Sequence, residues 1–184
     1  FGATESGRVA YEMAGLGPKD IDVAQLYDCF SIVPCPFKCL YCANPDTIAF
    51  EGGTMTEVEE IVKMAVSQKP FFGKCGGITF SGGEPTMQAK ELLPLYARLK
   101  EEEINICIDT NGGGWNSDIE ELLRQTDLVL LDCKQFNNER HEALTGRRNA
   151  QTIRTARWLE ENGKRQDSHW SGGMFGSCPP YALG

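Results

Sequence analysis

The chain has 184 residues and a globular composition, with 41% hydrophobic and 24% charged residues. Its formal net charge of −8 disfavours nucleic-acid binding, because that function needs a basic face. No apolar run approaches the ~18 residues that span a bilayer, and the N-terminus lacks a basic-then-apolar signal pattern. We therefore expect a cytoplasmic protein that binds no nucleic acid and no membrane, and whose partners are proteins or small molecules.

Helical patterns and apolar runs alternate after the cysteine-rich segment at 35–42. Thr56 and Glu59 form a capping box at the start of the first predicted helix. The apolar run at 76–85 predicts a buried strand that ends in a Gly-rich turn. Periodic leucines at 88–102 predict the next helix. This order of elements is typical of an α/β protein.

The same alternation continues to residue 164. We predict strands at 104–109 and 126–134, a short helix capped by Ser117 and Glu120, and a last helix at 149–162. Apolar strands separated by helices predict a parallel sheet, with functional residues beyond the carboxyl ends of the strands. The side chains expected to face the core are Val58, Ile61, Val62, Ala65, Val66, Leu92, Leu93, Tyr96, Leu99, Leu122 and Leu123.

Three of the eight cysteines, Cys35, Cys39 and Cys42, form a CxxxCxxC array. In a cytoplasmic chain such clustering favours metal binding over disulfides. Three thiolates can hold an iron–sulfur cluster and leave one iron open to a substrate. Two alternatives stay open, a structural zinc site with a distant fourth cysteine and buried free cysteines without metal. The isolated cysteines, expected to be small buried hydrophobes, are Cys29, Cys75, Cys107, Cys133 and Cys178.

Four segments carry a family resemblance: CPFKCLYCANPDT, GGITFSGGEPTMQ, ICIDTNG and TDLVLLDCKQ, in this order. Together they resemble the radical S-adenosylmethionine activating enzymes of glycyl-radical enzymes, most closely the type that acts on pyruvate formate-lyase. The resemblance covers about residues 33–164. It implies an α/β fold, an incomplete (β/α) partial barrel of the radical SAM type with a parallel sheet. Because relatives continue for two more strand–helix units, we expect one unpaired sheet edge here.

The resemblance also implies the cofactors. It assigns Cys35, Cys39 and Cys42 to a 4Fe–4S cluster whose open iron is chelated by the amino and carboxylate groups of S-adenosylmethionine. It places Tyr41 and Ala43, on either side of Cys42, against the adenosyl part of that cofactor. Many relatives have histidine at the position of Ala43, so this chain lacks a polar side chain there.

Further cofactor contacts are implied at the strand ends: Gly82, Gly83 and Glu84 after the first strand, and Asp109, Asp132, Cys133 and Lys134 at the next two. Asp109 and Asp132 would also hold a monovalent cation. The alternative for Glu84 is the first turn of a helix, and the alternative for Asp109 is a turn former. Arg140 and His141, on a short helix beyond this rim, are expected to be solvated.

The resemblance implies an oxidoreductase that reductively cleaves S-adenosylmethionine to a 5′-deoxyadenosyl radical and generates a glycyl radical on a partner such as pyruvate formate-lyase. Flavodoxin or ferredoxin would donate the electron, and no general base is required. One alternative is a non-catalytic metal-binding or scaffold remnant. The predicted organisation is an N-terminal fragment at 1–32, a radical SAM core, truncated as a partial barrel, at 33–164 and an irregular tail at 165–184.

Residues 1–32 resemble a different family, a sterol-carrier-type thiolase. The resemblance rests on ESGRVAYEMAGLGPKDIDVAQLYDCFSI, in which Asp28, Cys29 and Phe30 match a motif near the acyl-transfer site. About thirty residues do not supply a thiolase nucleophile, its histidine and its acyl-CoA pocket. An acyl-CoA thiolase fragment therefore stands as the third functional hypothesis.

Overall fold

The computed structural model describes residues 34–42, 44–48, 54–73, 76–164 and 166–170, together with Met13. The thiolase-like segment, apart from Met13, lies outside the described residues, as do Ala43, Cys75 and Cys178. The helices are α2 (Val58–Gln68), α3 (Ala89–Glu101), α4 (Ser117–Gln125), α5 (Asn138–Thr145) and α6 (Ala150–Glu161). The strands are β1 (Gly77–Phe80), β2 (Asn105–Thr110), β3 (Leu128–Cys133) and β4 (Gln166–Trp170). Short 3₁₀ turns are η2 (Pro45–Thr47), η3 (Lys69–Phe71) and η4 (Pro85–Gln88).

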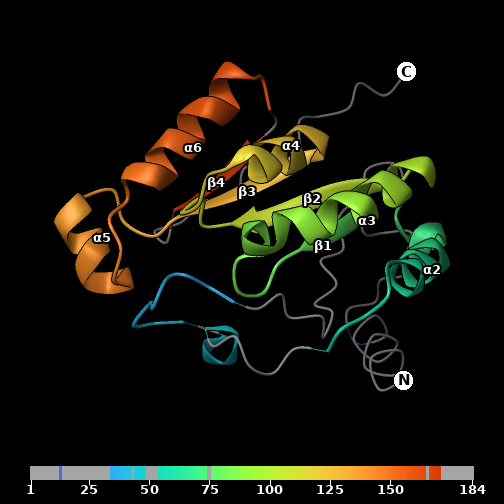
Figure 1. Cartoon of the computed structure of the whole chain (residues 1–184), viewed down its shortest axis with the longest axis horizontal. Coiled ribbons are helices and arrows are strands. Elements are labelled where there is room, and N and C mark those ends of the chain that lie inside the picture. The colour runs from blue at the N-terminus through green and yellow to red at the C-terminus, as the bar shows by residue number, and fades with distance from the viewer. Residues whose placement is uncertain are drawn as a thin grey trace.

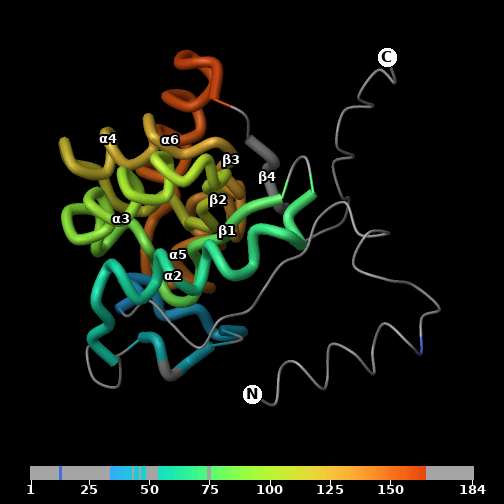
Figure 2. The backbone as a smooth tube through the Cα atoms, turned by 90° about the vertical axis from the view of Figure 1, so that its right-hand side faces the viewer, coloured from blue at the N-terminus to red at the C-terminus, as the bar shows by residue number. Residues whose placement is uncertain are grey.

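The four strands form one parallel sheet in the order β1-β2-β3-β4 (Figure 1). Figure 2 shows α3, α4 and α6 together on one side of this sheet. Each connection from β1 to β3 returns through a helix, which parallel pairing requires. The predicted α/β class with a parallel sheet is confirmed.

The core lies between the sheet and the helices on that side. Ile106 and Ile108 of β2 and Val129 of β3 are fully buried, because alternate residues of a strand face the same side. Tyr96 of α3 packs its ring 4.9 Å from that of Phe80. Burial of each such side chain contributes about 1.5–3 kcal/mol to folding.

The predicted inward positions are buried or packed against this core, with one exception. Val66 of α2 is 38% exposed, which makes its prediction wrong. The neighbouring Val62 and Ala65 are buried and pack into the hydrophobic core. The apolar stripe of α2 is therefore narrower than its sequence indicates.

Both predicted helix caps are shifted. The capping box at Thr56 is wrong, because Glu57 is the N-cap of α2 and makes no side-chain cap hydrogen bond. The cap of α4 is Asn116, whose Oδ1 accepts from Ile119 N at 2.8 Å, rather than Ser117. A side-chain oxygen caps a helix from the last residue with extended backbone before the first helical residue, and in α4 that residue is Asn116.

The expectation of an irregular tail from residue 165 is wrong for Gln166–Trp170. This segment is β4, which pairs with β3 in a register that joins Val129 to Gln166 and Cys133 to Trp170. The backbone N–H and C=O groups on the free side of β3 can pair with a five-residue strand whatever the side-chain pattern of that strand. The polar sequence QDSHW carried no strand periodicity that could have indicated this pairing.

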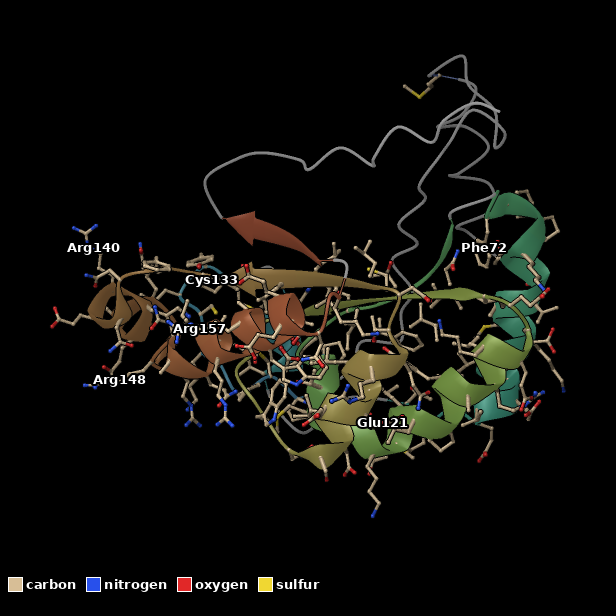
Figure 3. All side chains as sticks on the ribbon, turned by 90° about the horizontal axis from the view of Figure 1, so that it is seen from above. Phe72, Glu121, Cys133, Arg140, Arg148 and Arg157 are labelled. Atoms are coloured by element: carbon tan, nitrogen blue, oxygen red, sulfur yellow. The ribbon has the colours of Figure 1, made fainter. Side chains whose placement is uncertain are left out.

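Within the described part of the chain, none of the helices has the length and apolar composition needed to cross a membrane. Figure 3 shows many charged side chains pointing away from the ribbon, among them Glu121, Arg148 and Arg157. Arg140 is exposed, as predicted. His141, its neighbour, is fully buried, so the expectation of a solvated His141 is wrong.

Candidate cluster and cofactor site

A cavity of about 310 Å³ lies where the cysteine loop meets the carboxyl ends of the first three strands. The loop contributes its three cysteines, and the strand ends contribute carboxylates, glycines and a lysine. This is where parallel sheets place ligands, because the following loops converge there. The lining residues are Cys35, Phe37, Cys39, Tyr41, Cys42, Asn44, Thr47, Ser81, Gly82, Gly83, Asp109, Thr110, Asn111, Asp132 and Lys134.

The three cysteines of the array face this cavity together. The pKa of the Cys35 thiol is raised to about 11, mainly by burial and in addition by the negative charges of Glu84, Cys39 and Cys42, although a backbone hydrogen bond at Phe37 lowers it in part. Burial also raises the pKa of Cys39, although the charge of Lys134 lowers it. A bound metal centre would stabilise the thiolates that this environment disfavours.

The arrangement suits a cluster better than a single ion. Among the described residues, no group of three or more His, Cys, Asp or Glu side chains is placed to hold one metal ion. A zinc ion needs all its thiolate sulfurs about 2.3 Å from one central atom, whereas a four-iron cluster binds its thiolates at different corners of a cube. Three soft thiol donors around one cavity therefore fit a 4Fe–4S cluster, whereas in the described part of the chain no donors converge as a zinc ion requires.

The strand-end carboxylates lie on one face of the sheet. Asp109 of β2 is opposite Leu130 in the register, and Asp132 lies two residues farther along β3, so both side chains point to the same side. Asp109 Oδ2 accepts a hydrogen bond from Ser81 Oγ at 2.9 Å. The structure thus brings both predicted acids into the cavity, beside the end of β1.

Lys134 forms an ion pair with Asp132, and its ammonium group lies 5.9 Å from the ring centre of Tyr41. Burial lowers the pKa of Lys134, but the hydrogen bond and charge of Asp132, with smaller contributions from Cys39 and Tyr41, raise it overall. The lysine is therefore a cation at neutral pH. It joins the rim of β3 to the loop that carries the cysteines.

Gly82 and Gly83 supply backbone rather than side chain to the cavity wall. Gly82 has a φ of 122°, a conformation that residues with a Cβ rarely adopt. Without side chains at these positions, a ligand can approach the backbone N–H and C=O groups directly. The motif therefore lies at the cavity wall, where the predicted cofactor contact would be made.

Unlike Gly82 and Gly83, Glu84 does not line the cavity, and its predicted cofactor contact stays a prediction. It is fully buried, and Oε1 accepts from Thr110 Oγ1 at 2.5 Å and from Thr86 Oγ1 at 2.6 Å. Oε2 accepts from Asn111 N at 2.7 Å. The carboxyl group instead joins the turn after β1 to the end of β2, and Glu84 N donates to Pro34 O at 3.2 Å.

The side chain of Cys133 is also placed away from the cavity. Strand alternation turns it to the side opposite Asp132, where it is 8% exposed and its Sγ lies 3.8 Å from Gln135 O. The side chain is therefore not brought into the cavity, and the expectation of a buried small residue holds. A cofactor contact by Cys133 stays a prediction. Ala43, the remaining predicted contact, lies outside the described residues.

Sequence reasoning missed Asn111, which the structure places between the cluster loop and the core. Its Nδ2 donates to Cys35 Sγ at 3.6 Å, and its Oδ1 accepts from Gly113 N at 2.8 Å. An amide donor to a cluster sulfur is one way in which a protein tunes such a centre. The position directly after β2 was the available signal. The other lining residues that sequence reasoning did not single out are Phe37, Asn44, Thr47 and Thr110.

Phe37 anchors the loop from within, since its side chain is only 2% exposed. A Cβ at Gly113 would lie 2.5 Å from Phe37 Cε1 and 2.7 Å from Asn111 Oδ1. We expect Gly113→Ala to destabilise the fold by about 1–3 kcal/mol and to increase the alkylation rate of Cys35, because Phe37 and the loop must move. Denaturant unfolding and mass-spectrometric alkylation of the metal-free protein measure both effects.

Gly114→Ala is the matched control, because its Cβ would meet only Ile119 Cδ1, at 3.4 Å. It should change stability by less than about 0.5 kcal/mol and leave the alkylation of Cys35 unchanged. Equal effects of the two substitutions would show that backbone conformation, rather than the contact with Phe37, explains the result.

The fold and the three-cysteine cavity define the class of protein. The Radical SAM superfamily matches residues 32–176 of the chain. The chain therefore belongs to the Radical SAM superfamily, and the predicted family resemblance is confirmed. Membership implies a 4Fe–4S cluster and S-adenosylmethionine as cofactors.

Individual relatives narrow the comparison. Pyruvate formate-lyase-activating enzymes of Staphylococcus aureus strains USA300 and NCTC 8325 are 41% identical over 135 residues, which are 69% of this chain and 54% of theirs. The chain thus spans about half the length of the curated relatives it matches. A thiolase C-terminal domain-like family separately matches residues 1–38, which agrees with the predicted N-terminal resemblance.

Solved structures show the same fold. Streptococcus suis SuiB bound to precursor peptide SuiA is similar with a TM-score of 0.61 and 21% identity, over 76% of this chain and 31% of SuiB. SuiB bound to S-adenosylmethionine is similar with a TM-score of 0.57 and 21% identity, over 74% of this chain and 30% of SuiB. At this identity the likeness concerns the fold.

Proposed function

We propose that this chain carries the cluster and S-adenosylmethionine site of a glycyl-radical-enzyme activating enzyme, an oxidoreductase whose protein substrate resembles pyruvate formate-lyase. The observation that carries the proposal is the shared cavity of Cys35, Cys39 and Cys42 with the glycine turn after β1 and the acids of β2 and β3. The 41% identity to pyruvate formate-lyase-activating enzymes supports the choice of substrate. The radical SAM core is proposed to begin at residue 33, with β4 extending it beyond residue 164.

The chain's own residues divide the work of binding. Cys35, Cys39 and Cys42 would hold the cluster, which, when reduced, supplies the electron that cleaves S-adenosylmethionine into methionine and a 5′-deoxyadenosyl radical. The backbone at Gly82 and Gly83 lines the cavity and would contact the charged end of that cofactor, and Tyr41 lines the same cavity. Orientation and exclusion of water are the tasks left to the protein.

The rim supplies charge of both signs. Asp109 and Asp132 would offer carboxylates to the ammonium group of the cofactor or to a monovalent cation, and Lys134 would offer its ammonium group to the cofactor carboxylate. Oxygen ligands are the usual choice of hard cations. The electron would come from flavodoxin or ferredoxin. If a monovalent cation binds here, the protein should bind S-adenosylmethionine more tightly with potassium than without it. Titrations of the cofactor in the two conditions measure the difference.

Anaerobic reconstitution with iron and sulfide tests the proposal. We expect a brown protein with the absorption of a 4Fe–4S cluster, and release of methionine and 5′-deoxyadenosine after reduction with dithionite. Addition of pyruvate formate-lyase should then give a glycyl-radical signal in electron paramagnetic resonance. A colourless protein that retains zinc would overturn the cluster assignment. A cluster without cofactor cleavage would support the alternative of a metal-binding remnant.

A further inference from the structure

The loop that carries the cluster cysteines is held by the end of α5. Lys38 N donates to Thr145 O at 2.8 Å, and Leu40 N donates to Leu144 O at 2.9 Å. These two amides stand on either side of Cys39, the central cysteine of the array. The last carbonyl groups of a helix have no partner within it, so the cysteine loop here acts as the cap of α5.

Two further contacts join the same parts. Arg147 Nε donates to Pro36 O at 3.4 Å. The ring of Phe37 meets that of His141 edge to face, with centroids 5.4 Å apart and an interplanar angle of 86°. The loop is therefore fixed from Pro36 to Leu40 by α5 and the turn that follows it.

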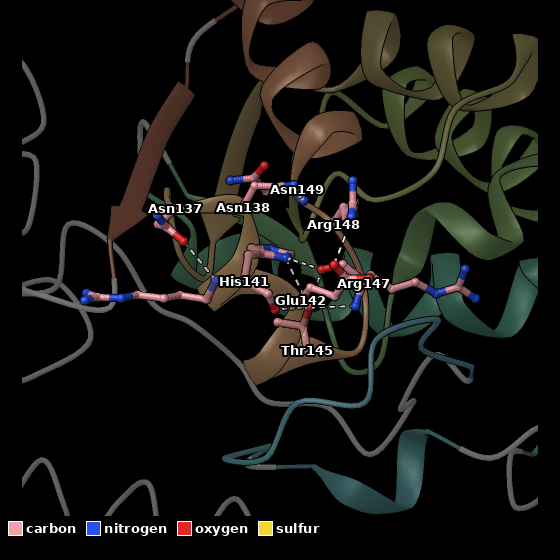
Figure 4. Close-up of polar contacts among 9 residues, drawn as sticks. Asn137, Asn138, His141, Glu142, Thr145, Arg147, Arg148 and Asn149 are labelled. Carbon is pink, nitrogen blue, oxygen red and sulfur yellow. Dashed lines mark hydrogen bonds and ion pairs between the residues drawn. The ribbon is translucent and has the colours of Figure 1, made fainter.

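His141 fixes that turn in place. Figure 4 shows its side chain directed at the Thr145–Arg147 turn. His141 Nδ1 lies 2.6 Å from Arg147 O and 3.1 Å from Thr145 Oγ1. A carbonyl oxygen only accepts, so Nδ1 carries the hydrogen. Gly146, with a φ of 73°, allows the chain to reverse between the two hydrogen-bonding residues.

The contacts within the turn make it one unit. Thr145 Oγ1 donates to His141 O at 2.8 Å and accepts from Arg147 N at 3.2 Å. Both His141 and Thr145 are fully buried. Among the described residues, Nε2 of His141 has no hydrogen-bond partner, so the imidazole forms its hydrogen bonds through Nδ1. Moving the buried Nδ1–H away from Arg147 O and Thr145 Oγ1 would leave it without an acceptor, which costs free energy.

We propose that His141 is the positioning residue of the cluster loop: its Nδ1–H orders the Thr145–Arg147 turn, and the turn holds the amides on both sides of Cys39. The inference rests on the proposed function, because it takes this loop to be the one that binds the cluster. His141 does not line the cofactor cavity, so it acts through the loop rather than on the reacting atoms.

Two isosteric substitutions separate the two ring nitrogens. Asparagine carries its amide nitrogen on Cγ, as histidine carries Nδ1, so His141→Asn keeps the donor to Arg147 O. Glutamine places its amide nitrogen one atom farther, near the position of Nε2, where the described structure offers no partner. Amide hydrogen exchange in the metal-free chain measures the loop directly, through Lys38 and Leu40.

We expect His141→Gln to speed exchange at Lys38 and Leu40 by roughly five- to tenfold, the loss of about one net hydrogen bond, while His141→Asn restores slow exchange. Core amides of β2, such as Ile108, serve as the internal control and should not change in either variant. Unchanged exchange at Lys38 and Leu40 in His141→Gln would overturn the inference, as would equal acceleration in both variants or a parallel acceleration at Ile108.

Thr145→Val provides a second variant if His141→Gln does not fold. It removes the hydroxyl group but keeps the size of the side chain, and it should accelerate exchange at the same two amides. After reconstitution, His141→Gln should also lose iron to a chelator faster than His141→Asn. If the wild-type chain assembles no cluster, the proposed function fails, and the exchange result still decides the role of His141 in the loop.

Discussion

Cys39→Ala is expected to abolish cluster assembly and with it all detectable cleavage of S-adenosylmethionine. Cys39 is the central thiol of the array and lines the cavity with Cys35 and Cys42. The intact array supplies three thiolates to four irons, so the loss of one would leave two irons of the cluster without a protein ligand. Iron and sulfide content, the visible absorption of the reconstituted protein and the yield of 5′-deoxyadenosine measure the loss, which should exceed about 10³-fold in rate.

Cys107→Ala is the matched control. Cys107 lies within β2 and does not line the cavity, so its removal deletes a thiol of the same chemistry outside the site. This variant should take up iron and sulfide like the wild type. A Cys39→Ala protein that still assembles a normal cluster would show that the ligand set has been assigned wrongly, and the proposed function would lose its main support.

Glu84→Ala is expected to destabilise the fold by about 2–4 kcal/mol. The substitution would leave the hydroxyl of Thr110 and the N–H of Asn111 buried without their acceptor. Since Asn111 also contacts Cys35, we expect weaker cluster binding as well. Urea unfolding measures the free energy, and Glu91→Ala, at an exposed position of α3, should change it by less than about 0.5 kcal/mol.

The same residue predicts a pH dependence. Burial raises the pKa of Glu84, and hydrogen bonds from Thr110, Thr86 and Asn111 lower it only in part. The folded state therefore holds this proton more tightly than the unfolded state. Its contribution to stability is complete below the ordinary glutamate pKa and is lost as the pH rises through the raised value. Glu84→Gln cannot titrate and should lack this loss, and identical pH profiles would contradict the assignment.

The cysteine array and the strand-end motifs could be predicted because chemistry and spacing are local. CxxxCxxC places three thiols on one short loop, and apolar strands that alternate with helices bring their carboxyl ends to one edge. The cavity accordingly contains Tyr41, Gly82, Gly83, Asp109, Asp132 and Lys134, all of which the sequence indicated.

The differences between the sequence-based expectations and the structure share a different physical cause. Cys133 and Glu84 sit within correctly identified motifs, but side-chain direction depends on strand phase and on which buried donors are within reach. The pairing of Gln166–Trp170 with β3 depends on backbone groups that every sequence has. Motif matching locates a residue along the chain and does not orient its side chain.

By itself the sequence determined the class of the protein, the three cysteines proposed as cluster ligands and the rim where its cofactor would bind, because spacing along a loop and periodicity along a strand are local properties. Only the tertiary structure decided that Glu84 belongs to the core, that Asn111 reaches Cys35, and that His141 holds a loop about a hundred residues before it. Contacts between residues so distant in the chain depend on how the elements pack, and no local pattern encodes them.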